Sequence, residues 1–238
     1  MEQGGLRGRT VLVTGGSKGI GLATTRLLAA AGASVHVLAR DPSAAARTCA
    51  ESGGDVWSVD VTEDADVWNA LDTFRERAGG PPDIVVNSAG SFVMRPLHET
   101  SVDEFDRQID VNLRGTFLVI RALLPDMLDR GSGDLVQIGS VAGRHAFPSN
   151  GAYSAAKFGL RGMHEVLVQE LRGTGVRATL VEPAATDTPI WDPMDPDANP
   201  GVPARSEMLR AEDVAEAVLF AVTRPSHVRV PSLQIERG

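Results

Sequence analysis

Cysteine and positive charge are both scarce in this chain. Its 238 residues include a single cysteine, Cys49, which cannot form a disulfide within the chain. Acidic residues outnumber basic ones by 31 to 23, which gives a formal net charge of −8 at pH 7. Because nucleic acids and anionic membrane surfaces bind positively charged proteins, we expect neither kind of partner. The lone cysteine fits a reducing compartment, and we expect a cytoplasmic protein.

Long apolar runs are absent from the sequence too. No stretch approaches the ~20 residues that a helix needs to cross a bilayer. Residues Met1–Thr10 are polar and Gly-rich, with no apolar stretch before Val11, so we expect no secretory signal and a soluble protein. Hydrophobic residues make up 42% and charged residues 23% of the chain, which provides for a sizeable core and argues against extensive disorder.

Short β-branched runs alternate with longer helical patterns along the chain. The runs that predict strands are Thr10–Val13, Val35–Leu38, Val56–Val59, Ile84–Val86, Leu135–Ile138, Val176–Val181 and Val228–Ile235. The patterns that predict helices are Ile20–Ala31, Asp64–Arg77, Val102–Leu128, Tyr153–Arg172 and Ala211–Val222, with a weaker one at Pro42–Glu51. Such alternation needs crossover connections, which favour a parallel sheet covered on both faces. We therefore predict an α/β fold with a doubly wound parallel sheet of about seven strands, in a single domain that spans residues 1–238.

One segment, Ala184–Glu207, departs from this alternation. It holds five prolines and four aspartates without a clear period, and Trp191 and Met194 lie among them. A stretch of ~20 residues without regular structure is long for a compact domain and is typical of a functional loop. Because Trp191 and Met194 are costly to expose, we predict a substrate lid at about residues 184–207. The alternative is a disordered surface loop.

A glycine-rich turn follows the first predicted strand and begins the first predicted helix. Thr14–Gly21 reads TGGSKGIG. Glycine permits a positive φ angle and lets a pyrophosphate approach the backbone, while the free N–H groups and dipole of a helix N-terminus attract an anion. Gly-rich turns also occur between strands and helices that bind nothing. The residues predicted to contact the phosphates are Gly15, Ser17, Lys18, Gly19 and Ile20.

The end of the second predicted strand bears on which nicotinamide cofactor binds. In NAD-binding folds an acid at this point receives the ribose 2′-hydroxyl, whereas an arginine suits the 2′-phosphate of NADP. Ala39 stands where the acid is expected, and Arg40 and Lys18 can both pair with a phosphate. We therefore predict NADP(H). Asp41, one residue further along, argues for the alternative, NAD(H).

Tyr153 and Lys157 lie four residues apart in a predicted helix and therefore share one face. Tyr153 is the only tyrosine, so no other phenol competes for a role in proton transfer. An ordinary tyrosine has a pKa of ~10, and we expect the neighbouring ammonium to favour the phenolate and lower that pKa. Ser140 ends the fifth predicted strand, thirteen residues before Tyr153. An exposed Tyr–Lys pair without a function is the alternative.

In their order along the chain, these motifs resemble those of the short-chain dehydrogenase/reductase family, and in particular its 3-oxoacyl-ACP reductase-like members. The likeness extends from Thr10 to about Val222. It implies a Rossmann fold and the NADP(H)-dependent reduction of a ketone or aldehyde by hydride transfer. The implied catalytic residues are Tyr153 as proton donor, Ser140 as the group that polarises the carbonyl, Lys157 as the support of Tyr153 and ligand of the nicotinamide ribose, and Asn112 as the holder of a water that connects Lys157 to solvent.

The resemblance also implies cofactor contacts outside the glycine turn. Asp60 and Val61 match the pair that holds the adenine ring. The segment Asn87-Ser88-Ala89-Gly90 resembles the NNAG motif, in which Asn87, Ala89 and Gly90 belong to the cofactor crevice. Pro183 and Thr188 match residues that meet the nicotinamide, but Ala184 replaces the usual glycine, which puts the geometry there in doubt. The predicted site includes no metal ligand.

Position along the chain also suggests substrate contacts. The candidates are Val141, His145, Phe147, Phe92, Met94 and Trp191. His145 either binds an acidic group of the substrate or is an incidental loop residue.

Two other functions share parts of this pattern. A non-catalytic NADP(H)-binding regulator has no need of Ser140, Tyr153 and Lys157 together. An NADP-dependent sugar epimerase or dehydratase usually carries TGxxGxxG and a larger C-terminal region, neither of which this sequence has.

The helices predicted at Val102–Leu128 and Tyr153–Arg172 carry more apolar positions than one contact with a sheet requires. Relatives pair these helices across a dimer interface, and many close into tetramers. We predict a homotetramer, with a dimer as the second choice.

Overall fold

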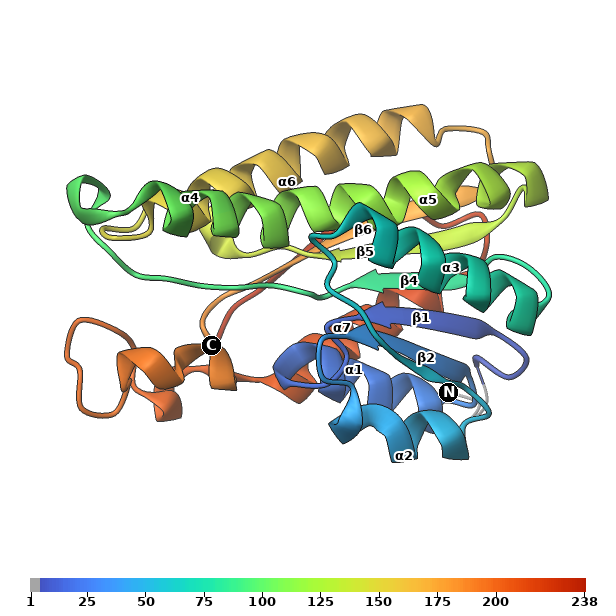
Figure 1. The fold of residues 1–238 in the computed structure, drawn as a ribbon, viewed down its shortest axis with the longest axis horizontal. Helices are drawn as coiled ribbons and strands as arrows, with labels where there is room; N and C mark the ends of the chain where they lie inside the picture. The colour runs from blue at the N-terminus through green and yellow to red at the C-terminus, as the bar shows by residue number, and fades with distance from the viewer. Residues whose placement is uncertain (1–4) are drawn as a thin grey trace.

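A seven-stranded parallel sheet forms the centre of the computed structural model, which describes residues 5–238 (Figure 1). Its order is β3-β2-β1-β4-β5-β6-β9. The strands are β1 Thr10–Thr14, β2 Ser34–Ala39, β3 Val56–Ser58, β4 Ile84–Asn87, β5 Gly133–Ile138, β6 Val176–Pro183 and β9 Ser232–Ile235. The predicted doubly wound α/β fold in a single domain is confirmed.

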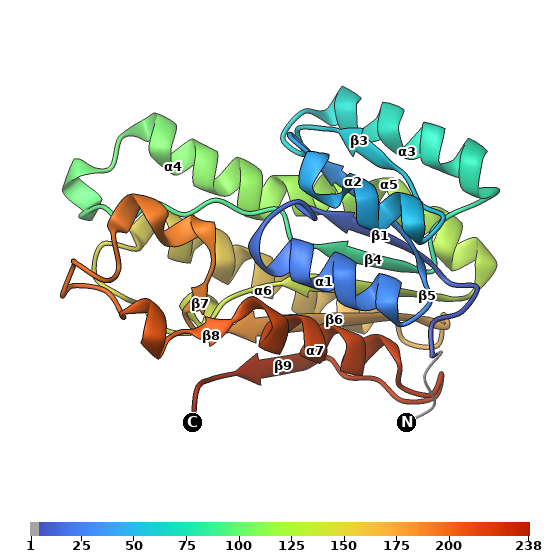
Figure 2. The ribbon, with the colours of Figure 1, turned by 90° about the horizontal axis from the view of Figure 1, so that it is seen from below.

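Helices cover both faces of the sheet. One face carries α1 Gly19–Ala30, α2 Ser43–Glu51 and α7 Ala211–Val222, which lie in front of the sheet in Figure 2. The other face carries α3 Asp64–Ala78, α4 Val102–Ile109, α5 Gly115–Arg130 and α6 Gly151–Glu170. Within residues 5–238, no helix combines the length and the apolar composition needed to cross a membrane.

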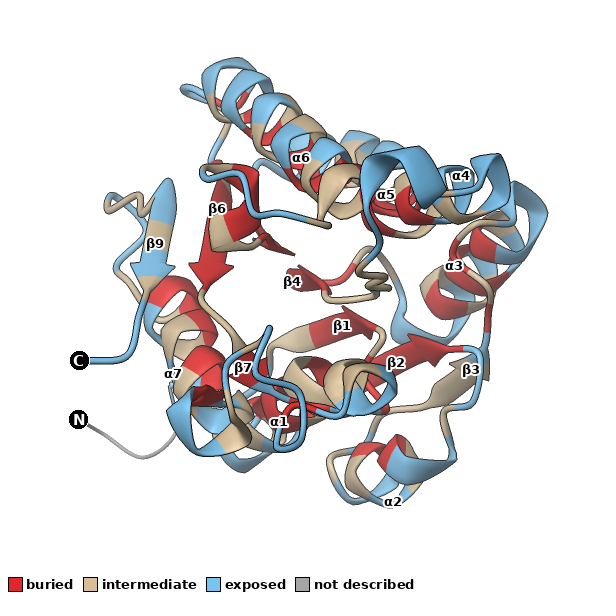
Figure 3. Cartoon of the chain, turned by 90° about the vertical axis from the view of Figure 1, so that its left-hand side faces the viewer, coloured by how far each residue is buried: buried red, intermediate tan, exposed pale blue. Residues whose placement is uncertain are grey.

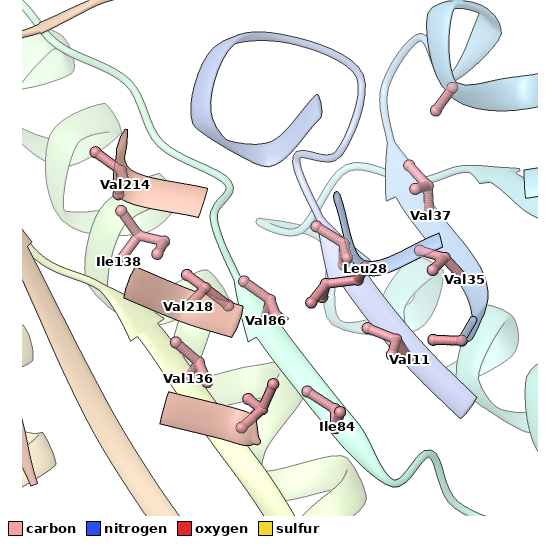
Figure 4. Packing of buried hydrophobic residues seen from close by; sticks show 14 of the residues in the cluster. Val11, Leu28, Val35, Val37, Ile84, Val86, Val136, Ile138, Val214 and Val218 are labelled. Carbon is pink, nitrogen blue, oxygen red and sulfur yellow. The ribbon is translucent and has the colours of Figure 1, made fainter. Parts of the chain in front are cut away.

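Alternation of side chains along each strand divides the core into two clusters. Val11 and Val13 of β1 pack with Leu28 of α1 on one face, as Figure 4 shows for Val11 and Leu28. Leu12, between them, packs with Phe74 of α3 on the opposite face. All five side chains are fully buried. Because successive strand residues point to opposite faces, a buried parallel sheet needs continuous apolar runs, which is what the sequence has.

The chain reverses its direction of winding between β1 and β4. From β1 it adds β2 and β3 on one side, and from β4 it adds β5, β6 and β9 on the other. The crossovers at this point leave in opposite directions, so a crevice opens beyond the carboxyl ends of the strands. In Figure 3 the buried strands lie at the centre, while the outer sides of α4 and α6 are largely exposed.

The predicted helix Val102–Leu128 is not continuous. A π-helical turn, η2 Asp110–Arg114, separates α4 from α5, and the N–H of Gly115 donates to the carbonyl of Asp110 five residues earlier. The prediction of one α-helix was wrong because apolar periodicity does not register one extra residue in a turn. The predicted strand Val228–Ile235 is also shorter than expected, since only Ser232–Ile235 pairs with β6.

Residues 184–207 contain more regular structure than expected. A two-residue strand, β7 Thr186–Asp187, pairs with β8 Leu209–Arg210, and two 3₁₀ turns follow at η4 Pro189–Met194 and η5 Arg205–Glu207. Arg205 holds the segment together, because its guanidinium pairs with Asp187 at 2.5 Å and Asp192 at 2.6 Å. Elements this short carry no periodic signal in a sequence.

Candidate active site

The residues singled out in the sequence gather at one cavity of about 1430 Å³ beyond the carboxyl ends of the strands. Those that line it are Gly15, Ser17, Lys18, Gly19, Ile20, Arg40, Asp60, Val61, Ala89, Gly90, Asn112, Ser140, Tyr153, Lys157, Pro183 and Thr188. Asn87 does not line the cavity. It is buried at the end of β4, and neither atom of its amide group has a hydrogen-bond partner.

The glycine turn is shaped so that a side chain would not fit. Gly15 has a φ of 66°, and a Cβ there would lie 2.7 Å from the main chain of Ala89. At the first residues of α1, the N-cap residue Lys18 has extended backbone and makes no capping hydrogen bond, and the first turn holds no acid. The helix therefore presents unpaired N–H groups and its positive end to the cavity, which fits the phosphates of a dinucleotide.

Two exposed cations, Arg40 directly after β2 and Lys18 directly before α1, lie at the cavity. Arg40 and Lys18 both line the cavity, and Ala39 before Arg40 is buried. The carboxylate of Asp41 accepts a hydrogen bond from the N–H of Ser43 at 3.1 Å, and hydrogen bonding from Ser43 holds the pKa of Asp41 below its ordinary value. The acid that argued for NAD(H) is thus engaged at the start of α2.

Asp60 and Val61 follow β3 at the same end of the cavity. The Asp60 carboxylate accepts hydrogen bonds from the N–H and the hydroxyl of Thr62, at 3.0 and 2.9 Å. Burial acts to raise the pKa of Asp60, but these hydrogen bonds and the charges of Arg40 and Arg107 outweigh it and leave the pKa below its ordinary value. Asp60 is therefore an anion fixed in orientation at the rim.

Ser140 and Tyr153 meet at the opposite end of the cavity. Ser140 precedes the 3₁₀ turn η3 Val141–Gly143, and its Oγ accepts a hydrogen bond from the N–H of Ala142 at 3.1 Å. Because that bond uses a lone pair of Oγ, the Ser140 hydroxyl can still donate a hydrogen bond of its own. Burial raises the pKa of Tyr153 to about 12, and a hydrogen bond with the Ser140 side chain acts against that rise. The expected lowering of the Tyr153 pKa by Lys157 is wrong for this structure, because burial of the phenol is the larger effect.

Lys157 is buried one helical turn beyond Tyr153. Its Nζ donates a hydrogen bond to the carbonyl of Ile138 at 2.9 Å and lies 5.6 Å from the centroid of the Tyr153 ring. Burial lowers the pKa of Lys157 to about 8. Burial therefore disfavours the charged form of both groups, the ammonium of Lys157 and the phenolate of Tyr153.

Asn112 lies in the π-helical turn, and its amide is occupied by protein groups. Its Nδ2 donates to the carbonyls of Ser91 and Gln108, each at 2.9 Å, and its Oδ1 accepts from the N–H of Ser91 at 3.2 Å. These bonds fix the turn against the segment that follows β4. The water-holding role implied by the resemblance stays a prediction.

Aromatic side chains form a wall beside Tyr153. The Phe92 ring lies 4.8 Å from the Tyr153 ring and 5.1 Å from that of Trp191, between centroids, and both contacts are edge-to-face. The predicted substrate contacts that line the cavity are Phe92, Met94, Val141, Phe147 and Trp191. His145 is exposed and lies outside the lining. The cavity therefore offers apolar contacts next to the phenol.

Pro183 and Thr188 lie on either side of the bend after β6. Ala184, which replaces the family's glycine, packs partly against the apolar cluster on the α1 and α7 face. Among residues 5–238, only Ser149 and Asp195 combine a side chain with a positive φ, so the methyl group of Ala184 causes no backbone strain. Thr188 contacts the glycine turn, because a Cβ at Gly19 would lie 2.9 Å from that of Thr188.

The C-terminal residues Glu236 and Arg237 also line the cavity, which no sequence pattern predicts. They follow β9, whose pairing with β6 brings the end of the chain beside residues 184–207. The Arg237 guanidinium donates to the carbonyl of Ser206. No motif marks these residues, because only the pairing of β9 places them here.

A parallel sheet with its ligand crevice at the winding reversal, a glycine turn at the start of α1 and a Ser–Tyr–Lys group defines a nucleotide-binding oxidoreductase. The chain belongs to the short-chain dehydrogenase family, whose model matches residues 9–199. This confirms the resemblance predicted from the motifs.

The relatives of this chain include an uncharacterized oxidoreductase of Staphylococcus aureus, which is 35% identical over 233 residues, or 97% of each chain. The alcohol dehydrogenase of the archaeon Thermococcus sibiricus, complexed with 5-hydroxy-NADP, has a TM-score of 0.82 at 28% identity and covers 95% of each chain. The 3-ketoacyl-(acyl-carrier-protein) reductase of Brucella melitensis, complexed with NADH, has a TM-score of 0.83 at 25% identity and covers 97% of each chain. Structures similar to this chain thus bind either nicotinamide cofactor.

Proposed function

We propose that this protein reduces a ketone or aldehyde to an alcohol with NADPH. The observation that carries the proposal is the meeting of Ser140 and Tyr153 beside buried Lys157, at the end of the cavity away from Arg40. When bound, NADPH would supply a hydride to the carbonyl carbon. Tyr153, with its raised pKa, is protonated at neutral pH and donates its proton to the carbonyl oxygen. The Ser140 hydroxyl keeps its proton and donates a hydrogen bond to the same oxygen as charge develops there.

Lys157 supports this proton transfer. Its pKa of about 8 keeps it mostly protonated at pH 7, close to the Tyr153 ring in a buried site. An ammonium there stabilises the phenolate that Tyr153 leaves behind, and little water screens that interaction. Lys157 also holds the nicotinamide ribose in this proposal.

NADP(H) is favoured over NAD(H) by the charges where the second strand ends. Arg40 and Lys18 offer two cations to a 2′-phosphate, and Asp41 is engaged by Ser43. Gly15, Ser17, Gly19 and Ile20 would receive the pyrophosphate at the start of α1. Adenine would lie against Asp60 and Val61, the riboses near Ala89 and Gly90, and the nicotinamide near Pro183 and Thr188. Asn87, which does not line the cavity, would act behind Ala89 and Gly90.

The substrate would lie between Tyr153 and the segment 184–207, which acts as its lid. Phe92 and Trp191 form the wall nearest to the phenol, so the groups attached to the carbonyl would be in apolar contact. His145 lies outside the lining and has no part in this proposal.

A homotetramer in the cytoplasm is the assembly we propose. The helices of one face expose apolar side chains, Phe105 on α4, Phe117 on α5, and Phe158 and Val166 on α6. Exposed apolar residues gathered on neighbouring helices are typical of an interface, and a two-fold axis would bury the same set on both subunits. The lone cysteine, Cys49, is buried and forms no disulfide within the chain, which is compatible with a reducing compartment.

The test is NADPH oxidation across a panel of ketones and aldehydes, with Tyr153→Phe as the variant. Loss of a positioned proton donor should lower kcat by about 10²–10⁴-fold and leave the Kd for NADPH unchanged. Near-full turnover by Tyr153→Phe on a good substrate contradicts the proposal. Tight NADPH binding without turnover of any carbonyl compound favours the non-catalytic regulator instead.

A further inference from the structure

A buried carboxylate lies directly behind the candidate active site. Glu182 is the residue of β6 before Pro183, and only 1% of its surface is exposed. An ionised carboxylate removed from water is costly unless opposite charges and hydrogen bonds compensate it. The proton-transfer steps proposed above do not use Glu182, so its retention at this place needs another reason.

Two arginines from different elements meet this carboxylate. Arg144, the residue after η3, donates from Nε to Oε2 at 2.7 Å and also pairs through its terminal nitrogen. Arg161 of α6 approaches Oε1 at 3.6 Å. Arg144 lies four residues after Ser140, and Arg161 lies on the same helix as Tyr153 and Lys157. Glu182 therefore connects the two elements that carry the candidate catalytic residues.

The loop that carries Ser140, residues 139–143, has no free space on either side. A Cβ at Gly139 would lie 3.2 Å from Cγ of Glu182, and one at Gly143 would lie 2.9 Å from the carbonyl of Lys157. The loop is thus packed between β6 and α6. Without the negative charge of Glu182, Arg144 would lose its hydrogen-bonded partner, and its guanidinium group and that of Arg161 would face a common site, where like charges repel. Glu165, which pairs with Arg161 at 2.9 Å, would be the anion left near them.

We propose that Glu182 is a positioning residue of the reaction, which sets the separation of Ser140 and Tyr153 through Arg144 and Arg161. This inference rests on the proposed function, since it assigns Glu182 an effect only through those two groups. Displacement of a reacting group by about 1 Å costs on the order of 100-fold in rate. Loss of the Glu182 charge should therefore lower kcat while the cofactor end of the cavity, built from α1 and β2, is unaffected.

The chain contains a matched control. Asp134 of β5 is also a buried carboxylate held by two arginines, Arg177 at 2.7 Å and Arg9 at 3.2 Å. It is the second residue of β5, at the amino ends of the strands and so opposite the cavity, and it is not among the lining residues. Asp134→Asn should lower the melting temperature much as Glu182→Gln does, without changing kcat. A purely structural role for Glu182 predicts the same behaviour from both variants.

The deciding experiment is a double-mutant cycle on kcat with Glu182→Gln and Ser140→Ala, together with the Kd for NADPH. We expect Glu182→Gln to lower kcat about 10- to 100-fold in the wild type, with an unchanged Kd, and to lower it far less in the Ser140→Ala background. An equal loss in both backgrounds, or an unchanged kcat with a lowered melting temperature, overturns the inference.

Arg144→Lys provides a second test of the inference. It keeps the positive charge but removes the planar guanidinium group, which contacts the Glu182 carboxylate through two nitrogens. If Glu182→Gln does not fold, Arg144→Lys is expected to show the same dependence on Ser140, and independence from Ser140 overturns the inference equally. If Ser140→Ala and Tyr153→Phe leave kcat unchanged, the proposed function fails first. If both lower kcat and Glu182→Gln does not, only the role of Glu182 fails.

Discussion

Lys157 should destabilise the protein at neutral pH, and Lys157→Met tests this directly. Burial lowers the pKa of Lys157 from 10.5 to about 8, which corresponds to a cost of about 3 kcal/mol for the buried ammonium. Between these two pKa values the folded state binds fewer protons than the unfolded state, so stability rises with pH across that window. The cost is complete at pH 7 and falls to about 1 kcal/mol at pH 10.

Lys157→Met removes this cost but also leaves the Ile138 carbonyl without its donor, which costs about 1–3 kcal/mol. The lost hydrogen bond contributes at both pH values, so the change between them is the measurable quantity. Relative to the wild type, the free energy of unfolding of Lys157→Met should fall by about 2 kcal/mol from pH 7 to pH 10. The raised pKa of Tyr153 affects both proteins alike and cancels in the comparison.

Urea unfolding of both proteins without cofactor, at pH 7 and pH 10, measures the difference. Lys18→Met is the control, because it makes the same change at an exposed lysine of the same cavity. A difference between Lys157→Met and the wild type that stays constant from pH 7 to pH 10 would falsify the reasoning, since the ammonium would then be as well solvated in the folded protein as in water.

Three further predictions concern the cofactor, the substrate and the assembly. Arg40→Ala should raise the KM for NADPH about 10- to 100-fold in steady-state assays, because a charge-assisted phosphate contact is worth about 1.5–3 kcal/mol; equal use of NADH and NADPH by the wild type contradicts the assignment. Trp191→Ala should raise the KM for bulky apolar ketones more than for acetone, because it removes one side of the aromatic wall; an equal effect on both means that Trp191 does not contact the substrate. Light scattering at micromolar concentration should give four times the chain mass of 25.2 kDa, and Phe158→Arg should lower it; a monomeric wild type rules out the predicted interface.

The sequence by itself determined the layered α/β fold and the identity of the candidate site. Unbroken apolar runs such as Val11–Val13 and Ile84–Val86 can be satisfied only inside a sheet covered on both faces, and the helices between them require parallel strands. The glycine turn at Thr14–Gly21 and the four-residue spacing of Tyr153 and Lys157 are local patterns. They can therefore be recognised in the sequence without knowledge of the tertiary structure.

Tertiary structure alone decided the properties that depend on what surrounds a side chain. The pKa of Tyr153 rises because the phenol is buried, an effect that its spacing from Lys157 does not reveal. The π-helical turn at Asp110–Arg114 accompanies bonds from Asn112 to Ser91, twenty-one residues earlier. Glu182 meets Arg144 across thirty-eight residues, and β9 brings Glu236 and Arg237 to the cavity. Periodicity and motif spacing report neighbours along the chain, whereas desolvation and ion pairing act between residues that only the packing of the sheet and helices brings together.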